Sequence, residues 1–180
     1  MKNNFVQAAE NIFFKRRGAA ESQLQDAAKF VSGFTISSAI IYLLLSLTGS
    51  VLNKIAAYSA AAVANNFFET TVAETGLLPH LQGFANGVFF DAEISALCSG
   101  ALELAVMGGL VFASRDKPFK ERLKGIFLGT IVLLVFNPIR IFLTLSTVGT
   151  PLLIVFHDAL FRISLVILLA VFYALWYYWK

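Results

Sequence analysis

The chain contains one cysteine, Cys98, whose thiol is the side chain best suited to covalent chemistry. A single cysteine cannot form an internal disulfide, so its role is reactive, metal-linked or simply one of apolar packing. Only a few per cent of a thiol is ionised at neutral pH, and a neighbouring cation raises that fraction. Arg140 could supply that cation and stabilise a developing oxyanion, while His157 could take up and return a proton. These three residues are therefore candidates for a nucleophilic catalytic site.

Residues next to these three could support them. Ser99 and Gly100 are small and keep the approach to the thiol open. Asn137 precedes Arg140 by one helical turn on the same face, so its amide could orient the guanidinium. Pro138 removes one helical hydrogen bond at this point and is expected to free a carbonyl group.

Four other ionisable residues lie near the three candidates in the sequence and could contact the site. Glu103 and Arg162 are charges inside apolar segments, where an unpaired charge costs a few kcal/mol. We expect them to pair with each other or to contact the site from its second layer, and a purely structural ion pair is the simpler interpretation. Asp91 and Glu93 could bind a cation, although two carboxylates alone are a weak metal signal.

Each candidate also has a purely structural interpretation. A lone cysteine in an apolar helix is usually a small buried hydrophobe, and Arg140 could extend to lipid headgroups. His157 and Asp158 could mark no more than a helix start, with the carboxylate interacting with the helix dipole. His80 is a rival base, but it lies in a segment rich in glycine and proline.

The composition indicates a membrane protein. Of the 180 residues, 58% are hydrophobic and only 14% are charged, and the mean hydropathy is +0.74. A soluble domain does not have this composition. The formal net charge is a modest +3 and the basic residues lie beside apolar segments, which points to membrane orientation and to no nucleic-acid partner. The length suits a single polytopic domain, 1–180.

Apolar segments predict an all-α integral membrane protein with about four transmembrane helices, each long enough for a hydrocarbon core of about 30 Å. We predict spans at residues 30–47, 94–114, 125–146 and 157–179, joined by a loop at 115–124 and a turn at 147–156.

The remaining segments are predicted to lie at the two membrane surfaces. Residues 1–29 have apolar positions at helical spacing followed by three basic residues, which predicts a cytosolic amphipathic helix ahead of the 30–180 core. Residues 55–68 are apolar but short, so we expect an extracytoplasmic interfacial or re-entrant helix. Glycine and proline then predict turns up to residue 87, with a short extended segment at 88–94.

The distribution of basic residues sets the orientation. The N-terminal segment and the 115–124 loop each carry five Lys or Arg, whereas 49–97 carries one basic and four acidic residues. Because Lys and Arg favour the cytosolic side, both termini are predicted to be cytoplasmic in a multi-pass protein of the cell membrane.

Helical rise then places the three candidates at similar depth. Cys98 is roughly 25 Å above the basic loop, Arg140 roughly 24 Å above its other end, and His157 roughly 28 Å above the C-terminal aromatic belt. The spacing therefore predicts that the three side chains converge near the outer face.

Three segments of the chain resemble the signature segments of the exosortase/archaeosortase family, in the same order and at similar helix ends. They are Ala96-Leu97-Cys98-Ser99-Gly100, Asn137-Pro138-Ile139-Arg140 and Phe156-His157. The resemblance covers about residues 50–175, and a histidine at the third motif is similar to the His-containing branches of the family. Many relatives have about twice as many helices, so parts that dock the substrate would be absent or supplied by a partner.

The resemblance implies a membrane cysteine transpeptidase with Cys98 as nucleophile and Arg140 and His157 completing the site. Its substrates would be surface proteins that end in a short motif, a transmembrane helix and a basic tail. The enzyme would transfer the new C-terminus to an amine acceptor, such as a lipid headgroup. No metal or organic cofactor is implied.

Two other functions are compatible with the sequence. The chain could be a non-enzymatic binding or transport subunit in which Glu103 and Arg162 line a pathway, or a thiol protease that only hydrolyses its substrate.

Overall fold

The computed structural model describes residues 2–48, 51–74, 76–158 and 163–178, and the side chains within these ranges except those of residues 2–20, 158 and 165. The described chain is mostly helical and contains a small sheet. In chain order the elements are α1 (Lys2–Leu47), α2 (Val51–Ala64), β1 (Thr70–Ala73), β2 (His80–Ala85), β3 (Val88–Glu93), α3 (Ala101–Ala113), α4 (Phe119–Leu145), α5 (Leu152–Asp158) and α6 (Ser164–Tyr178).

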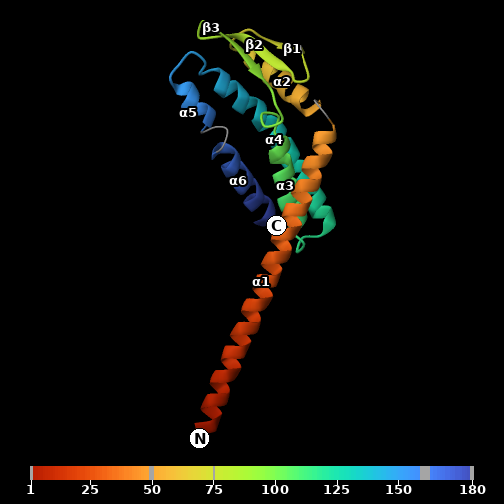
Figure 1. Cartoon of the computed structure of the whole chain (residues 1–180), viewed down its shortest axis with the longest axis vertical. Coiled ribbons are helices and arrows are strands. Elements are labelled where there is room, and N and C mark those ends of the chain that lie inside the picture. Colours follow the sequence, from red (N-terminus) through yellow and green to blue (C-terminus); the bar gives the residue numbers. More distant parts are fainter. Residues whose placement is uncertain (1, 49–50, 75, 159–162, 179–180) are drawn as a thin grey trace.

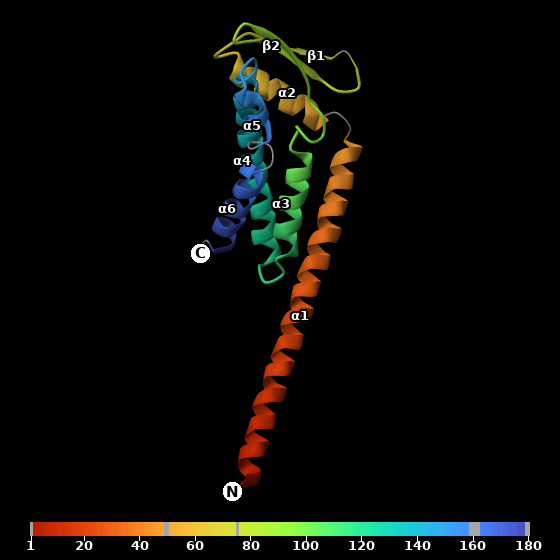
Figure 2. The same ribbon diagram turned by 60° about the vertical axis from the view of Figure 1, so that its left-hand side comes forward.

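The helices α3, α4 and α6 and the upper part of α1 form a bundle, and α2 and the sheet cover one end of it (Figures 1 and 2). The connection between α3 and α4 lies at the opposite end, together with the end of α6. The Tyr177 hydroxyl donates to Asp116 in that connection at 2.7 Å. The N-terminal part of α1 extends well beyond the bundle on this second side (Figure 2).

The first helix differs from the prediction. We expected a surface helix over 1–29 and a separate span from residue 30, but α1 is one continuous helix of 46 residues. The sequence contains no proline before Pro79, and residues 19–29 are rich in alanine, glutamine and other good helix formers. Nothing in the chain therefore interrupts the helix between the two predicted segments.

The prediction of an all-α fold is wrong for β1, β2 and β3, which form a three-stranded antiparallel sheet in that order; the extended segment expected at 88–94 corresponds to β3. The turn between β2 and β3 is Asn86-Gly87, with φ angles of 52° and 77°. Two positive φ angles define the tight hairpin turn for which the Asn-Gly dipeptide is best suited. The apolar alternation of Leu81, Ala85 and Phe90 then places one face of the sheet in the core.

Several predicted boundaries also shift. The second predicted span, 94–114, is helical only from Ala101, because residues 94–100 form a turn. The predicted loop at 115–124 ends at Pro118, which precedes α4. The predicted turn at 147–156 contains the start of α5, and the fourth predicted span is divided between α5 and α6.

Two described helical segments are long and apolar enough to cross a membrane by length and composition, Glu21–Leu47 and Phe119–Leu145. They correspond to the first and third predicted spans. The apolar parts of α3 and α6 are shorter, at Ala101–Ala113 and Val166–Tyr178.

Small residues allow the helices of the bundle to approach closely. A Cβ atom on Gly109 would collide with Ser38 of α1, and one on Gly129 would lie 2.7 Å from Met107 Cε of α3. Close backbone approach through glycine and serine is typical of helix packing in membranes.

The sheet is fixed to the bundle by its own core. Four alanines of α2 form a small-residue stripe, and the buried face of the sheet packs on it together with the upper end of α4. The buried members are Ala56, Ala57, Ala60, Ala61, Leu81, Ala85, Phe90, Ile94, Ile141 and Leu145. Cys98 lies partly buried against this cluster, so the position of the thiol depends on how the sheet is seated.

We predict that Gly109→Ala lowers the free energy of unfolding by about 1–3 kcal/mol, because its Cβ must displace Ser38 in a packed interface. Gly76→Ala is the matched control, since nothing lies within 4 Å of its Cβ. Thermal unfolding in detergent measures both variants, and equal stability would show that the α1–α3 contact is not tight.

Candidate functional site

Cys98 lies in a tight turn between the sheet and α3. The backbone N–H groups of Cys98 and Ser99 both donate to the Ser95 carbonyl at 3.0 Å. Gly100 then has a φ of 84°, a left-handed conformation that suits glycine, and α3 begins at the next residue. We expected Cys98 to open the helix and gain from its dipole, but the thiol precedes α3 by three residues.

Two side chains of α4 hold this turn by one atom, the carbonyl oxygen of Cys98. Asn137 Nδ2 donates to it at 2.9 Å and Arg140 Nη2 donates to it at 3.3 Å. Both side chains are buried, with exposed fractions of 5% and 1%. The one-turn spacing expected for these residues therefore directs both donors at the backbone of the cysteine.

The guanidinium of Arg140 is also paired with a carboxylate. Arg140 Nη1 lies 3.6 Å from Oε1 of Glu103, which is itself buried on α3. Within the described ranges, the other carboxylate oxygen of Glu103 and the amide oxygen of Asn137 have no hydrogen-bond partner. We expected Glu103 either to pair with Arg162 or to contact the site, and it contacts the site. Arg162 lies outside the described residues.

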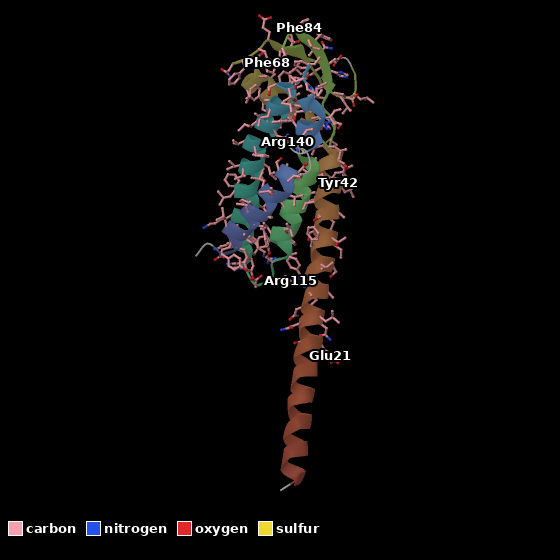
Figure 3. All side chains as sticks on the ribbon, turned by 90° about the vertical axis from the view of Figure 1, so that its left-hand side faces the viewer. Glu21, Tyr42, Phe68, Phe84, Arg115 and Arg140 are labelled. Atoms are coloured by element: carbon pink, nitrogen blue, oxygen red, sulfur yellow. The ribbon has the colours of Figure 1, made fainter. Side chains whose placement is uncertain are left out.

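A cavity of about 140 Å³ brings the three candidate residues together. Its walls come from the end of β3, the cysteine turn, the upper part of α4 and one residue of α5. The lining residues are Ala92, Glu93, Ile94, Cys98, Arg140, Ile141, Thr144, Leu145 and His157. Figure 3 places Arg140 in the upper half of the bundle, below the sheet, whereas Arg115 lies at the opposite end.

The supporting residues have different surroundings. Ser99 is buried and its hydroxyl donates to the Ala96 carbonyl at 3.0 Å, so it holds the turn and does not open an approach. Ser95 Oγ lies 3.8 Å from Cys98 Sγ, the distance of a weak hydrogen bond to sulfur. His157 is exposed in the last turn of the short helix α5, which ends at Asp158; the side chain of Asp158 lies outside the described part of the structure.

The rival base, His80, belongs to a different cluster on the outer face of the sheet. Its Nδ1 lies 2.7 Å from Asp91 Oδ1, and Gln82 donates to the other carboxylate oxygen at 3.0 Å. These hydrogen bonds lower the pKa of Asp91, with that from His80 the larger cause. Since none of these three residues lines the cavity, His80 is not placed to act on Cys98. Both carboxylate oxygens of Asp91 therefore have side-chain partners on β2.

In the portions of the chain that are described, no group of three or more His, Cys, Asp or Glu side chains is arranged to hold a metal ion.

The extended segment expected at 88–94 is β3, but sequence reasoning did not assign it a part in the cavity wall. Glu93, at the end of β3, lines the cavity beside Cys98, although we considered it only as a cation ligand. The signal was present in the sequence, because Asn86-Gly87 between two alternating apolar stretches predicts a hairpin that ends at Glu93.

The fold and the site define a helical protein in which one partly buried thiol lies above a buried Arg–Glu pair. No protein-family model matches the chain, and neither the curated proteins nor the solved structures contain a significant match.

We predict that Asn137→Leu, which keeps the branched shape of the side chain but is larger and has no donor, destabilises the fold by about 1–3 kcal/mol, because a buried carbonyl loses a partner and the larger side chain must fit a buried position. Alkylation of Cys98 by iodoacetamide should become faster, since the turn is then held by Arg140 alone. The control is Asn66→Leu, whose amide bonds only its own exposed helix end. Unchanged stability and alkylation would contradict the role of the Asn137 hydrogen bond.

Proposed function

We propose that this chain is a membrane-embedded cysteine transpeptidase of the exosortase/archaeosortase type. The observation that carries the proposal is the single cavity shared by Cys98, Arg140 and His157, which come from three separate parts of the chain. The resemblance of the three motif segments to that family supports the same conclusion.

In the proposed reaction, His157 takes the thiol proton and the sulfur of Cys98 attacks the scissile carbonyl of a surface protein. The carbonyl carbon forms a bond to sulfur and a tetrahedral oxyanion develops, which Arg140 stabilises from the wall of the cavity. Collapse of this intermediate breaks the peptide bond, and His157 returns its proton to the leaving amine. The products are a thioester on Cys98 and a free C-terminal fragment.

An amine acceptor then completes the transfer. Its nitrogen attacks the thioester carbon, its proton passes to His157, and the thiolate leaves and recovers that proton. A new amide bond therefore replaces the thioester, and the enzyme returns to its starting state. The cavity holds about 140 Å³, and a small, largely apolar cavity limits the water that competes with the amine.

Glu103 and Asn137 serve the reaction by positioning. Glu103 holds the guanidinium of Arg140 at 3.6 Å in a buried environment, and Asn137 fixes the backbone of the nucleophile at 2.9 Å. Catalytic groups must be held within a fraction of an ångström for efficient reaction, so this buried set would keep thiol and cation aligned.

The proposal includes a bilayer with four crossings, made by α1, α3, α4 and the α5–α6 segment. The sheet and α2 then lie at the outer face, and the basic connection between α3 and α4 lies in the cytosol with both termini. The substrate helix would reach the site from within the bilayer, with its motif at the outer face.

The decisive test is the Cys98→Ala substitution in cells of the organism whose genome encodes this protein. Cleavage of the surface proteins that end in a motif, a transmembrane helix and a basic tail should stop, while the variant still inserts into the membrane. Mass spectrometry of the mature C-terminus measures the outcome, since an added amine indicates transfer and a free carboxylate indicates hydrolysis. Normal maturation in Cys98→Ala cells would end the proposal and leave a binding or transport role.

Arg140→Lys should reduce processing by roughly 100-fold, because an ammonium cannot donate to the Cys98 carbonyl, face Glu103 and bind an oxyanion in one fixed geometry. The rate of processing is measured by pulse–chase labelling of the surface protein whose cleavage stops in Cys98→Ala cells. Arg115→Lys, at the far end of the bundle, is the matched control and should process normally. A normal rate in Arg140→Lys would leave Arg140 with a structural role only.

A further inference from the structure

The third strand has one edge that no other strand covers. In the register of the hairpin, Val88 faces Ala85, Phe90 faces Gly83 and Ala92 faces Leu81. Because the turn has two residues, Val88 and Ala85 form a hydrogen-bonded pair. Along an antiparallel ladder, hydrogen-bonded pairs alternate with pairs that do not exchange hydrogen bonds. The backbone groups of Phe89, Asp91 and Glu93 therefore point away from β2.

These outward groups have no backbone partner in the described part of the chain. The sheet order is β1-β2-β3, so β3 has a single neighbour, and the hydrogen bonds outside the ladder include none to Phe89, Asp91 or Glu93. At its hairpin end, the edge meets the segment that follows α4, because Asn86 Nδ2 donates to the carbonyls of Ser146 and Val148 at 2.9 Å each. An open edge of this kind is a template for another extended chain.

The open edge leads directly to the nucleophile. Ala92, Glu93 and Ile94, at the end of β3, form one wall of the cavity whose other walls include Cys98 and Arg140. A chain lying along the edge from Phe89 to Glu93 would travel roughly 13 Å and enter the cavity at its last residue. The other edge differs, because β1 is two strands away and its Thr70 N–H already donates to Asn65 Oδ1 at 2.7 Å.

We propose that β3 binds the processed protein by strand addition: the residues immediately before the scissile bond pair with Phe89, Asp91 and Glu93 as a fourth strand. This inference rests on the proposed function and names how that site binds its substrate. Main-chain hydrogen bonds would supply the affinity, and the 140 Å³ cavity would admit the residue at the scissile bond.

The direction of the added strand follows from the chemistry. The segment after the scissile bond must continue into the bilayer as a helix, so it cannot also follow the sheet. The segment before that bond therefore occupies the edge, with its C-terminal end in the cavity. Because β3 also runs from the hairpin toward the cavity, the added strand is parallel to β3.

The first experiment uses the surface protein whose cleavage stops in Cys98→Ala cells. In that Cys98→Ala background, p-benzoylphenylalanine replaces Phe89, Glu93 or Thr71, one at a time, and the crosslinked peptides are identified after illumination. We expect crosslinks from both β3 positions to the N-terminal side of the cleavage point, with position 89 reaching farther from it than position 93. Thr71, exposed on β1, is the control and should give none.

The second experiment removes one backbone donor at a time. Asp91→Pro deletes an outward N–H that the added strand would use, while Asp91→Ala deletes the same side chain and keeps that N–H. Processing by Asp91→Pro should be roughly 2- to 10-fold slower than by Asp91→Ala, the effect of one hydrogen bond. Val72→Pro and Val72→Ala, at the outward position of the opposite edge, should not differ from each other.

The outcomes separate the two proposals. If Cys98→Ala stops processing but the crosslinks are absent or in reversed order, or Asp91→Pro matches Asp91→Ala, strand addition is overturned and the transpeptidase proposal stands. If no protein depends on Cys98, both fall. Thermal unfolding of each proline variant checks that the sheet remains intact, because a proline at an outward edge position keeps the ladder to β2.

Discussion

One carbonyl oxygen, that of Cys98, connects the parts of this structure. It accepts hydrogen bonds from Asn137 and Arg140 of α4, and Arg140 in turn faces Glu103 of α3. The turn between the sheet and α3 is thus held by α4, through groups that are nearly all buried. Removing one partner of a buried ion pair costs about 3–5 kcal/mol, so the Arg–Glu contact constrains the turn strongly even if it adds little net stability. The thiol is consequently placed chiefly by the backbone of its turn, in addition to its weak contact with Ser95 and its packing against the core cluster.

The helical part of the fold could be predicted from hydropathy, since long apolar segments admit few alternatives in a chain of this composition. The helix boundaries could not, because hydropathy alone does not separate the turn at 94–100, which contains Ile94, Ala96 and Leu97, from the apolar helix that follows. The sheet was predicted only in part, because an extended segment was expected at 88–94 but not at β1 or β2. β1 has only four residues and β2 contains Gly83, so the useful signal for the hairpin was the Asn86-Gly87 turn, because its two positive φ angles suit this dipeptide.

For the site, counting residues along the predicted spans put Cys98, Arg140 and His157 at similar depth. The structure places all three on one cavity, although Cys98 precedes α3 and His157 belongs to α5 and not to α6. However, the depth of a residue in the membrane does not say in which direction its side chain points from the helix axis. That Arg140 donates to the Cys98 carbonyl, and that Glu103 selects Arg140 as its partner, depends on the rotation of α3 and α4 about their axes. The position of β3 in the cavity wall depends on tertiary contacts with the cysteine turn and α4, and hydropathy does not predict such contacts.

The first helix sets a dimension for the whole molecule. Its 46 residues measure about 69 Å, more than twice the hydrocarbon thickness of a bilayer. If α1 crosses a membrane near the normal, roughly 40 Å of it must stand in the aqueous phase as an unsupported rod, as its separation from the bundle in Figure 1 illustrates. The start of α1 at Lys2 would then lie far from the lipid surface, and a neighbour on that side would meet this part of α1 before it meets the bundle.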